Sequence, residues 1–124
     1  MQKLILLTGA GLAGLSVIIG AFGSHALKKF LEANERTDTF NTAVTYQFYH
    51  SLALLLIGGL MFKIPHRFMH YAAWSHIAGI ILFSGSLYIL CLTHNTKWGV
   101  ITPLGGVLFI VGWVFLSIAV SKSI

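Results

Sequence analysis

The chain has 124 residues, of which 56% are hydrophobic and only 9% are charged, and its formal net charge is +5. Soluble domains carry about 25% charged residues, so this composition excludes an ordinary soluble domain and indicates a chain that is covered largely by lipid. The basic residues stand singly or in pairs and form no aromatic and basic stripe, so we expect no nucleic-acid partner.

Four long segments contain no Asp, Glu, Lys or Arg. Each exceeds the about 20 residues that a helix needs to cross a hydrocarbon layer. We therefore predict an all-α, integral membrane four-helix bundle that forms a single domain over residues 1–124. The predicted spans cover residues 4–24, 40–62, 69–92 and 99–121.

The first span contains two patterns that have other meanings elsewhere. Its apolar run is longer than the about 7 to 15 residues of a secretory signal, so we expect the span to be retained. Gly9 to Gly14 matches the G-x-G-x-x-G pattern of dinucleotide sites, but no strand precedes it. Small residues spaced four apart favour close packing between helices instead. The packing candidates over the whole chain are Gly14, Gly20, Gly23, Gly105, Gly106 and Gly112.

Residues 25–38 contain all three acidic residues of the chain. The apolar residues of this segment recur every three or four positions: Ala26, Leu27, Phe30 and Leu31. This spacing predicts a short amphipathic helix that lies at the membrane interface between the first two spans. We expect Asn34 to end this helix, and the Thr37 to Thr39 run to supply side-chain caps for the second span.

Polar side chains inside the second and third spans are the main functional candidates, because such groups are costly in lipid and often mark sites. Gln47 and His50 lie about one turn apart near the middle of the second span, and Ser84, Ser86 and Tyr88 lie on the third. We expect these groups to form hydrogen bonds across the bundle. The bonds serve either to hold the helices together or to build a small-molecule site or proton relay.

The remaining connections are short. Pro65 predicts a turn between the second and third spans, because proline cannot continue a helix at that point. Thr102 and Pro103 predict the N-cap and first residue of the fourth helix, after an irregular segment that begins at Trp98. Cys91 is the single cysteine, and we interpret it as a small buried residue rather than a disulfide or metal ligand.

The six histidines raise the question of a metal or a haem. His66 and His70 lie one turn apart, but no acid or thiolate accompanies them, so we predict no metal site. His50 and His76 are the candidate haem ligands. At 1.5 Å per residue from the turn between them, His50 lies about 18 Å deep and His76 about 10 Å deep. This difference argues against haem, and we expect no cofactor. Because no carboxylate lies in a span, we also expect no enzymatic activity.

The Lys and Arg residues lie near the ends of the spans, where they act as interfacial anchors, and they do not predict an orientation. One side of the membrane would carry Lys3, Lys63, Arg67 and Lys122. The other side would carry Lys28, Lys29, Arg36 and Lys97. The two sides carry equal numbers of Lys and Arg residues, so the positive-inside rule favours neither orientation.

Four segments carry a family resemblance: GAFGSHAL (20–27), YQFYHSLALL (46–55), FSGSLYIL (83–90) and ITPLGGVLFIVGW (101–113). In this order and spacing the chain resembles, over essentially its whole length, the domain of unknown function 423 family. The vertebrate transmembrane protein 256 looks like a relative of that family. The resemblance implies a multi-pass protein of the bacterial inner membrane. It places the family's motif positions at His25, Gln47, His50, Ser84, Ser86, Tyr88, Thr102 and Pro103.

Two hypotheses about function follow. The first is a structural or interaction protein whose partners are membrane lipids, further copies of the chain or a larger membrane complex. The resemblance agrees with this, because some members of the family are linked with membrane integrity. The alternative is a small transporter or ligand-binding bundle with a mid-membrane polar site at Gln47 and His50.

Overall fold

The computed structural model describes all 124 residues and contains only helices, which confirms the predicted all-α class. Four helices are long and apolar enough to cross a membrane. Their ends lie within one turn of the predicted span ends. The elements are α1 (Gln2–Ser24), α2 (Lys28–Ala33), α3 (Thr37–Leu60), α4 (Arg67–Thr93), the 3₁₀ helix η1 (Thr96–Val100) and α5 (Thr102–Ser123).

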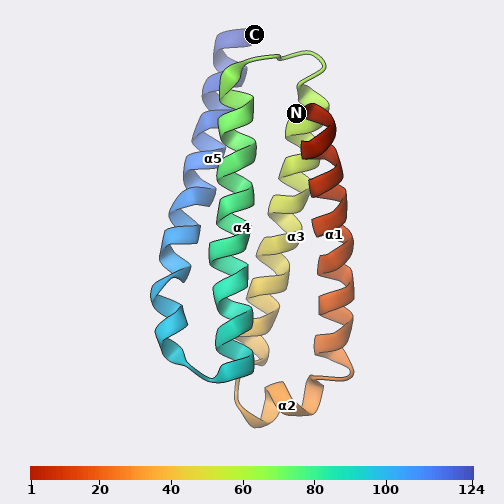
Figure 1. Ribbon diagram of the computed structural model, residues 1–124, viewed down its shortest axis with the longest axis vertical. Helices are drawn as coiled ribbons and strands as arrows, with labels where there is room; N and C mark the ends of the chain where they lie inside the picture. Colours follow the sequence, from red (N-terminus) through yellow and green to blue (C-terminus); the bar gives the residue numbers. More distant parts are fainter.

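The four long helices stand side by side in the order α1, α3, α4, α5, with both termini at the same end (Figure 1). The main contacts follow that order, since α1 packs on α3, α3 on α4, and α4 on α5. The central helices carry most of the buried residues. In α4 eleven residues are buried, whereas α1 buries only Ile5, Gly9 and Ser16. The outer helices therefore turn most of their apolar surface outward.

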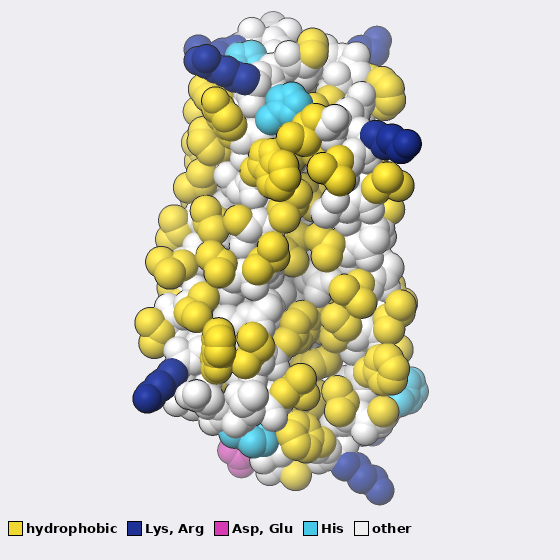
Figure 2. Space-filling model, in the orientation of Figure 1, with side chains coloured by type: hydrophobic (Ala, Val, Ile, Leu, Met, Phe, Trp, Pro, Cys, Tyr) yellow, Lys and Arg dark blue, Asp and Glu magenta, His cyan; other side chains and the backbone are white.

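The surface has the polarity of a protein that spans a membrane. Lys and Arg side chains lie toward the two ends of the molecule, and hydrophobic side chains cover the face between them (Figure 2). Long basic side chains at such positions reach the headgroup region while their stems stay in contact with apolar surface. The apolar face between the two charged ends is the part that contacts lipid.

The short helix α2 closes one end of the bundle below α1 and α3 (Figure 1). Leu31 is 1% exposed and packs against Phe40 and Cys91. Asn34 ends the helix as predicted, and its side-chain Nδ2 donates a hydrogen bond to the carbonyl of Phe30 at 2.8 Å. The amphipathic segment is thus held by one buried leucine on the side that faces the bundle.

The predicted side-chain cap of α3 is wrong. The helix begins at Thr37 itself, its N-cap is Arg36, and no side chain caps it. Thr37 is already inside the first turn, and its hydroxyl is buried without a partner. Asp38 also lies in the first turn, where its negative charge interacts favourably with the free amide groups of the helix start.

The turn predicted at Pro65 is present, and a histidine completes it. The helix α4 begins at Arg67, and the Nδ1 atom of the N-cap residue His66 accepts a hydrogen bond from the amide of Phe68 at 3.1 Å. From the sequence, His66 is considered only as a possible metal ligand, whereas in the structure its ring nitrogen caps a helix.

Four of the packing glycines lie where two helices approach each other: Gly20, Gly23, Gly105 and Gly112. An added Cβ at Gly105 would overlap the backbone of Phe83, and at Gly112 it would lie 2.9 Å from ring atoms of His76. At these positions only glycine leaves room for the neighbouring helix.

Gly14 and Gly106 differ from the other candidates. A Cβ at Gly14 would meet no atom within 4 Å, so Gly14 makes no contact between helices of this chain. The packing prediction is wrong for Gly14 inside the bundle because this residue lies on the side of α1 that faces away from α3. At Gly106 the nearest atoms are 3.9 Å away on the ring of Phe83, which is ordinary contact. A tight contact that the candidate set missed is at Gly9, where a Cβ would lie 3.0 Å from Leu54.

Candidate functional site

Gln47 joins three helices in the middle of the bundle. Its side chain is 2% exposed. The Nε2 group donates a hydrogen bond to the carbonyl of Leu12 on α1 at 3.0 Å, and the Oε1 atom accepts one from the Tyr88 hydroxyl on α4 at 2.6 Å. Both ends of the amide are therefore engaged, and the residue acts as an interhelical contact.

The serines of α4 tie this helix to its two neighbours. The Ser84 hydroxyl donates to the carbonyl of Ala43 on α3 at 2.7 Å, and the Ser86 and Thr102 hydroxyls form a hydrogen bond of 2.6 Å. The Thr102 hydroxyl is therefore used between α4 and α5. The predicted N-cap role of Thr102 is wrong, because the N-cap of α5 is Ile101 and no side chain caps the helix.

His50 is held by a hydrogen bond at each ring nitrogen. Its Nε2 atom lies 3.2 Å from the indole Nε1 of Trp113, and its Nδ1 atom lies 2.8 Å from the carbonyl of Tyr46. An indole nitrogen only donates, so Nε2 is the acceptor and the proton is on Nδ1, which donates to the carbonyl. The bond to Trp113 links α3 to α5 and fixes the tautomer of His50.

His76 has no comparable partners. Its side chain is 0% exposed, and neither ring nitrogen makes a hydrogen bond. The ring lies 5.3 Å from that of His50, and it meets the Trp113 ring edge-on at 4.9 Å. On the side of α5 it lies against Gly112. His76 is the one ionisable side chain in the core whose polar atoms packing leaves unsatisfied.

His50 and His76 lie at nearly the same depth, so the predicted difference in depth is wrong. The helix α3 ends at Leu60 and α4 begins at Arg67, two residues earlier in each case than predicted. The distances along the helices become about 15 Å for His50 and about 14 Å for His76 at 1.5 Å per residue. The depth argument against a shared ligand therefore does not hold. No three His, Cys, Asp or Glu side chains lie close enough together to hold a metal ion, so His50 and His76 have no third ligand beside them.

The remaining candidates do not converge on a single cavity. His25 is exposed and follows the last residue of α1, outside the polar core. No hydrogen bond joins Gln47 to His50, and the two share no hydrogen-bond partner. The structure divides the predicted site into separate contacts between pairs of helices. It adds Trp113, which was not a candidate, and it places His76, considered from the sequence only as a haem ligand, beside His50.

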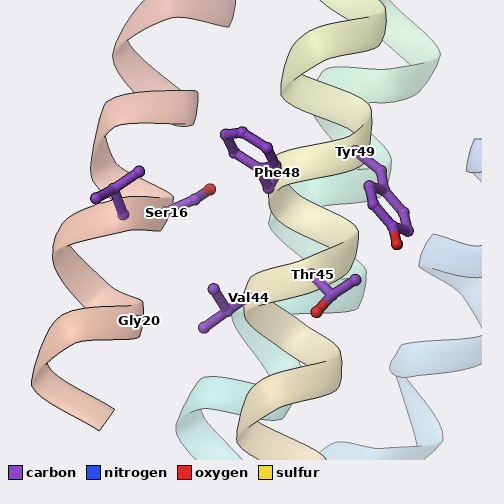
Figure 3. A pocket seen from close by; sticks show the side chains of 7 residues that line it. Ser16, Gly20, Val44, Thr45, Phe48 and Tyr49 are labelled. Carbon is purple, nitrogen blue, oxygen red and sulfur yellow. The ribbon is translucent and has the colours of Figure 1, made fainter. Parts of the chain in front are cut away.

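Several open grooves run along the outside of the bundle, and two of them expose polar groups of the long helices. The first, of about 380 Å³, lies between α1 and α3. Ser16 points toward α3 in this groove, and its hydroxyl donates to the carbonyl of Leu12 at 2.9 Å (Figure 3). The residues of this groove that Figure 3 labels are Ser16, Gly20, Val44, Thr45, Phe48 and Tyr49. The buried polar group of this groove is satisfied within its own helix.

The second groove, of about 490 Å³, lies between α3 and α5. We call it the aromatic groove, and its defining residues are Tyr46, His50, Phe83, Gly106, Phe109 and Trp113. A signal for it is present in the sequence, because Tyr46 and His50 are one turn apart. Its far wall depends on where α5 packs, which the sequence does not specify.

We expect replacement of His76 by Leu to keep or raise stability, by about 1 kcal/mol, because an unsatisfied buried polar group is costly. Thermal unfolding in detergent measures this. His50→Leu is the matched control, and it is expected to lower stability, since it removes the acceptor of the Trp113 indole. A large loss of stability in His76→Leu would show that the imidazole has a partner.

Comparison with known proteins relates the chain to bacterial membrane proteins. Residues 19–106 match the family described as "Protein of unknown function (DUF423)". A UPF0382 membrane protein of Staphylococcus aureus is 47% identical over 121 residues, which covers 98% of each chain. A UPF0382 membrane protein of Bacillus subtilis is 40% identical over 122 residues, again 98% of each chain. No solved structure matches the chain. The names of these relatives place them in membranes and state no enzymatic activity.

Proposed function

The chain belongs to the DUF423 family of multi-pass bacterial membrane proteins, and from this premise we propose that it is a structural or interaction protein that acts without catalysis. The observation that carries the proposal is that buried polar side chains bond directly to a neighbouring helix, either to its backbone carbonyls or to its side chains. Gln47, Ser84 and Ser86 each join one helix to the next. Such contacts fix the register of the helices.

The outward face of α1 supports an interaction role. Ala10, Gly14 and Ala21 lie on nearly the same side of this helix, and all three are exposed. The same face of α1 also carries Leu7 and Val17, which are 61% and 64% exposed, so the small residues form a narrow strip beside bulky ones. In a bilayer, small residues let helix backbones approach closely, whereas bulky aliphatic residues face lipid tails well. We infer that α1 packs against a helix of a second copy of the chain.

A single substitution tests this assembly. Gly14→Leu is expected to reduce the crosslinked oligomer in the membrane to a small fraction of the wild-type amount, while the fold is kept because no atom lies within 4 Å of the new Cβ. Gly85→Leu is the matched control, since this glycine of α4 also has no neighbour within that distance. Equal crosslinking in both variants would contradict the assembly.

Gly20 and Gly112 are unsuitable for the same test. Both contact a neighbouring helix of the same chain, at Val44 and His76 respectively. Their replacement by Leu reports on folding, and a loss of assembly there would not identify an external partner.

The alternative function, a ligand site shared by Gln47 and His50, has less support. Gln47 already bonds to Leu12 and Tyr88, and His50 bonds to Tyr46 and Trp113. The two residues stabilise different helix pairs.

A further inference from the structure

We propose that the aromatic groove binds a lipid-soluble molecule of the quinone class, meaning a planar ring that carries carbonyl or hydroxyl groups and an apolar tail. The proposal goes beyond the interaction role above, because it concerns the groove between α3 and α5 and needs no second copy of the chain. Its volume of about 490 Å³ lies within the range of about 300 to 1,000 Å³ that is usual for small-molecule sites.

The groove presents a continuous series of aromatic rings. The ring of Tyr46 stacks on that of Phe83 with centroids 4.7 Å apart, and Phe83 lies 5.5 Å from Phe109. Phe109 in turn stacks on His50 at 3.6 Å with an angle of 11° between the ring planes. Phe109 and His50 are themselves buried, and the rings that expose surface in the groove are Tyr46 and Trp113, at 40% and 41%. Such ring surface binds a planar ring by stacking more favourably than it binds a flexible acyl chain.

The groove also offers hydrogen-bonding groups that its own residues leave incompletely used. Tyr46 is 40% exposed, and its side-chain hydroxyl makes no hydrogen bond within the protein, whereas its backbone carbonyl accepts one from His50. A hydroxyl without a partner is costly in hydrocarbon, and a carbonyl oxygen of a bound ring would accept its hydrogen bond. Behind the groove wall, His76 is buried against Trp113 with both nitrogens unpartnered.

The depth of these groups identifies the class of ligand. Tyr46 is nine residues from the start of α3, and Trp113 is eleven residues from the start of α5. At 1.5 Å per residue they lie about 14 Å and about 17 Å along their helices from the helix starts at that end of the bundle, which places them well inside the hydrocarbon layer. A phospholipid keeps its headgroup at the interface and would present only its tails here. A neutral ring that dissolves in the hydrocarbon layer reaches this depth with its polar atoms.

The test uses the full-length protein in lipid nanodiscs and a decyl-substituted benzoquinone as the probe. Trp74→Phe and Trp98→Phe leave Trp113 as the only tryptophan, so quenching of its fluorescence reports binding at the groove. We expect quenching that saturates with probe concentration. Gly106→Leu fills the groove, and its Cβ has only ordinary contacts at 3.9 Å, so the fold is kept. This variant is expected to raise the Kd at least about tenfold, and Tyr46→Phe about fivefold through loss of one hydrogen bond.

Gly85→Leu is the control in this experiment, because Gly85 does not line the groove and a Cβ there meets no atom within 4 Å, so the Kd is expected to stay unchanged. Quenching that rises linearly and equally in wild type and Gly106→Leu reflects simple partitioning into lipid and would overturn the proposal. Equal competition by decanol would also overturn it, since it would show that the groove selects a tail and not a ring. A Gly106→Leu protein that loses oligomers but keeps the wild-type Kd would assign the groove to a second copy of the chain.

Discussion

Replacing Gly105 with Ala is expected to lower the stability of the protein by about 3 kcal/mol, the upper end of typical overpacking costs. The added Cβ would overlap the backbone nitrogen and Cα of Phe83, with the Cβ of Phe83 also 2.7 Å away. No change of rotamer relieves an overlap with backbone, so α4 and α5 must move apart. Thermal unfolding in detergent measures the loss, and the separation of the helices also weakens the bond between Ser86 and Thr102.

The adjacent glycine is the matched control for this experiment. Gly106→Ala places a Cβ 3.9 Å from the ring of Phe83, which is a normal contact. Alanine also favours helix over glycine by about 1 kcal/mol, so this variant is expected to be as stable as wild type or more stable. If both variants lost the same stability, the close approach of α4 and α5 at Gly105 would be wrong.

Replacing Gln47 with Leu is expected to cost about 1 to 2 kcal/mol. The change removes two hydrogen bonds, to Leu12 and to Tyr88, and such bonds average about 0.6 kcal/mol each in membrane proteins. It also leaves the partly buried Tyr88 hydroxyl without an acceptor, which adds to the loss. Unfolding of the purified protein in detergent, followed by circular dichroism, measures the change.

A double-mutant cycle isolates the bond between these side chains. Tyr88→Phe alone removes the same hydroxyl, so the double variant is expected to lose less than the sum of the two single variants, by about 1 kcal/mol. The remaining cost of Gln47→Leu then belongs to the bond with Leu12. Losses that simply add would show that Gln47 and Tyr88 do not interact.

The positions of the helices could be predicted because they follow from local chemistry. Uncharged runs long enough to span a bilayer gave α1, α3, α4 and α5, and the spacing of apolar residues gave α2. The depth of His50 and His76 could not be predicted with the same success. It depends on helix ends, and an error of two residues at each end of the turn changed the relative depth of the two rings by about one turn.

The candidate site was harder to predict because it depends on which side of each helix meets a neighbour. Gly14 and Gly20 stand in similar small-residue patterns, but only Gly20 contacts α3. Thr102 follows the sequence rule for an N-cap, and its hydroxyl bonds to Ser86 instead. Trp113 acquires its role through a residue 63 positions earlier in the chain. Tertiary packing determines these contacts, and the local sequence does not specify them.

The order in which the long helices contact one another also bears on how the chain is made. Each long helix after the first packs on the long helix that precedes it in the sequence, and the main contacts join only such consecutive helices. During synthesis, every newly inserted span therefore meets a partner that is already in the bilayer. No early span has to wait for a distant later one or exchange a temporary neighbour, so the polypeptide can assemble progressively from its first span to its last.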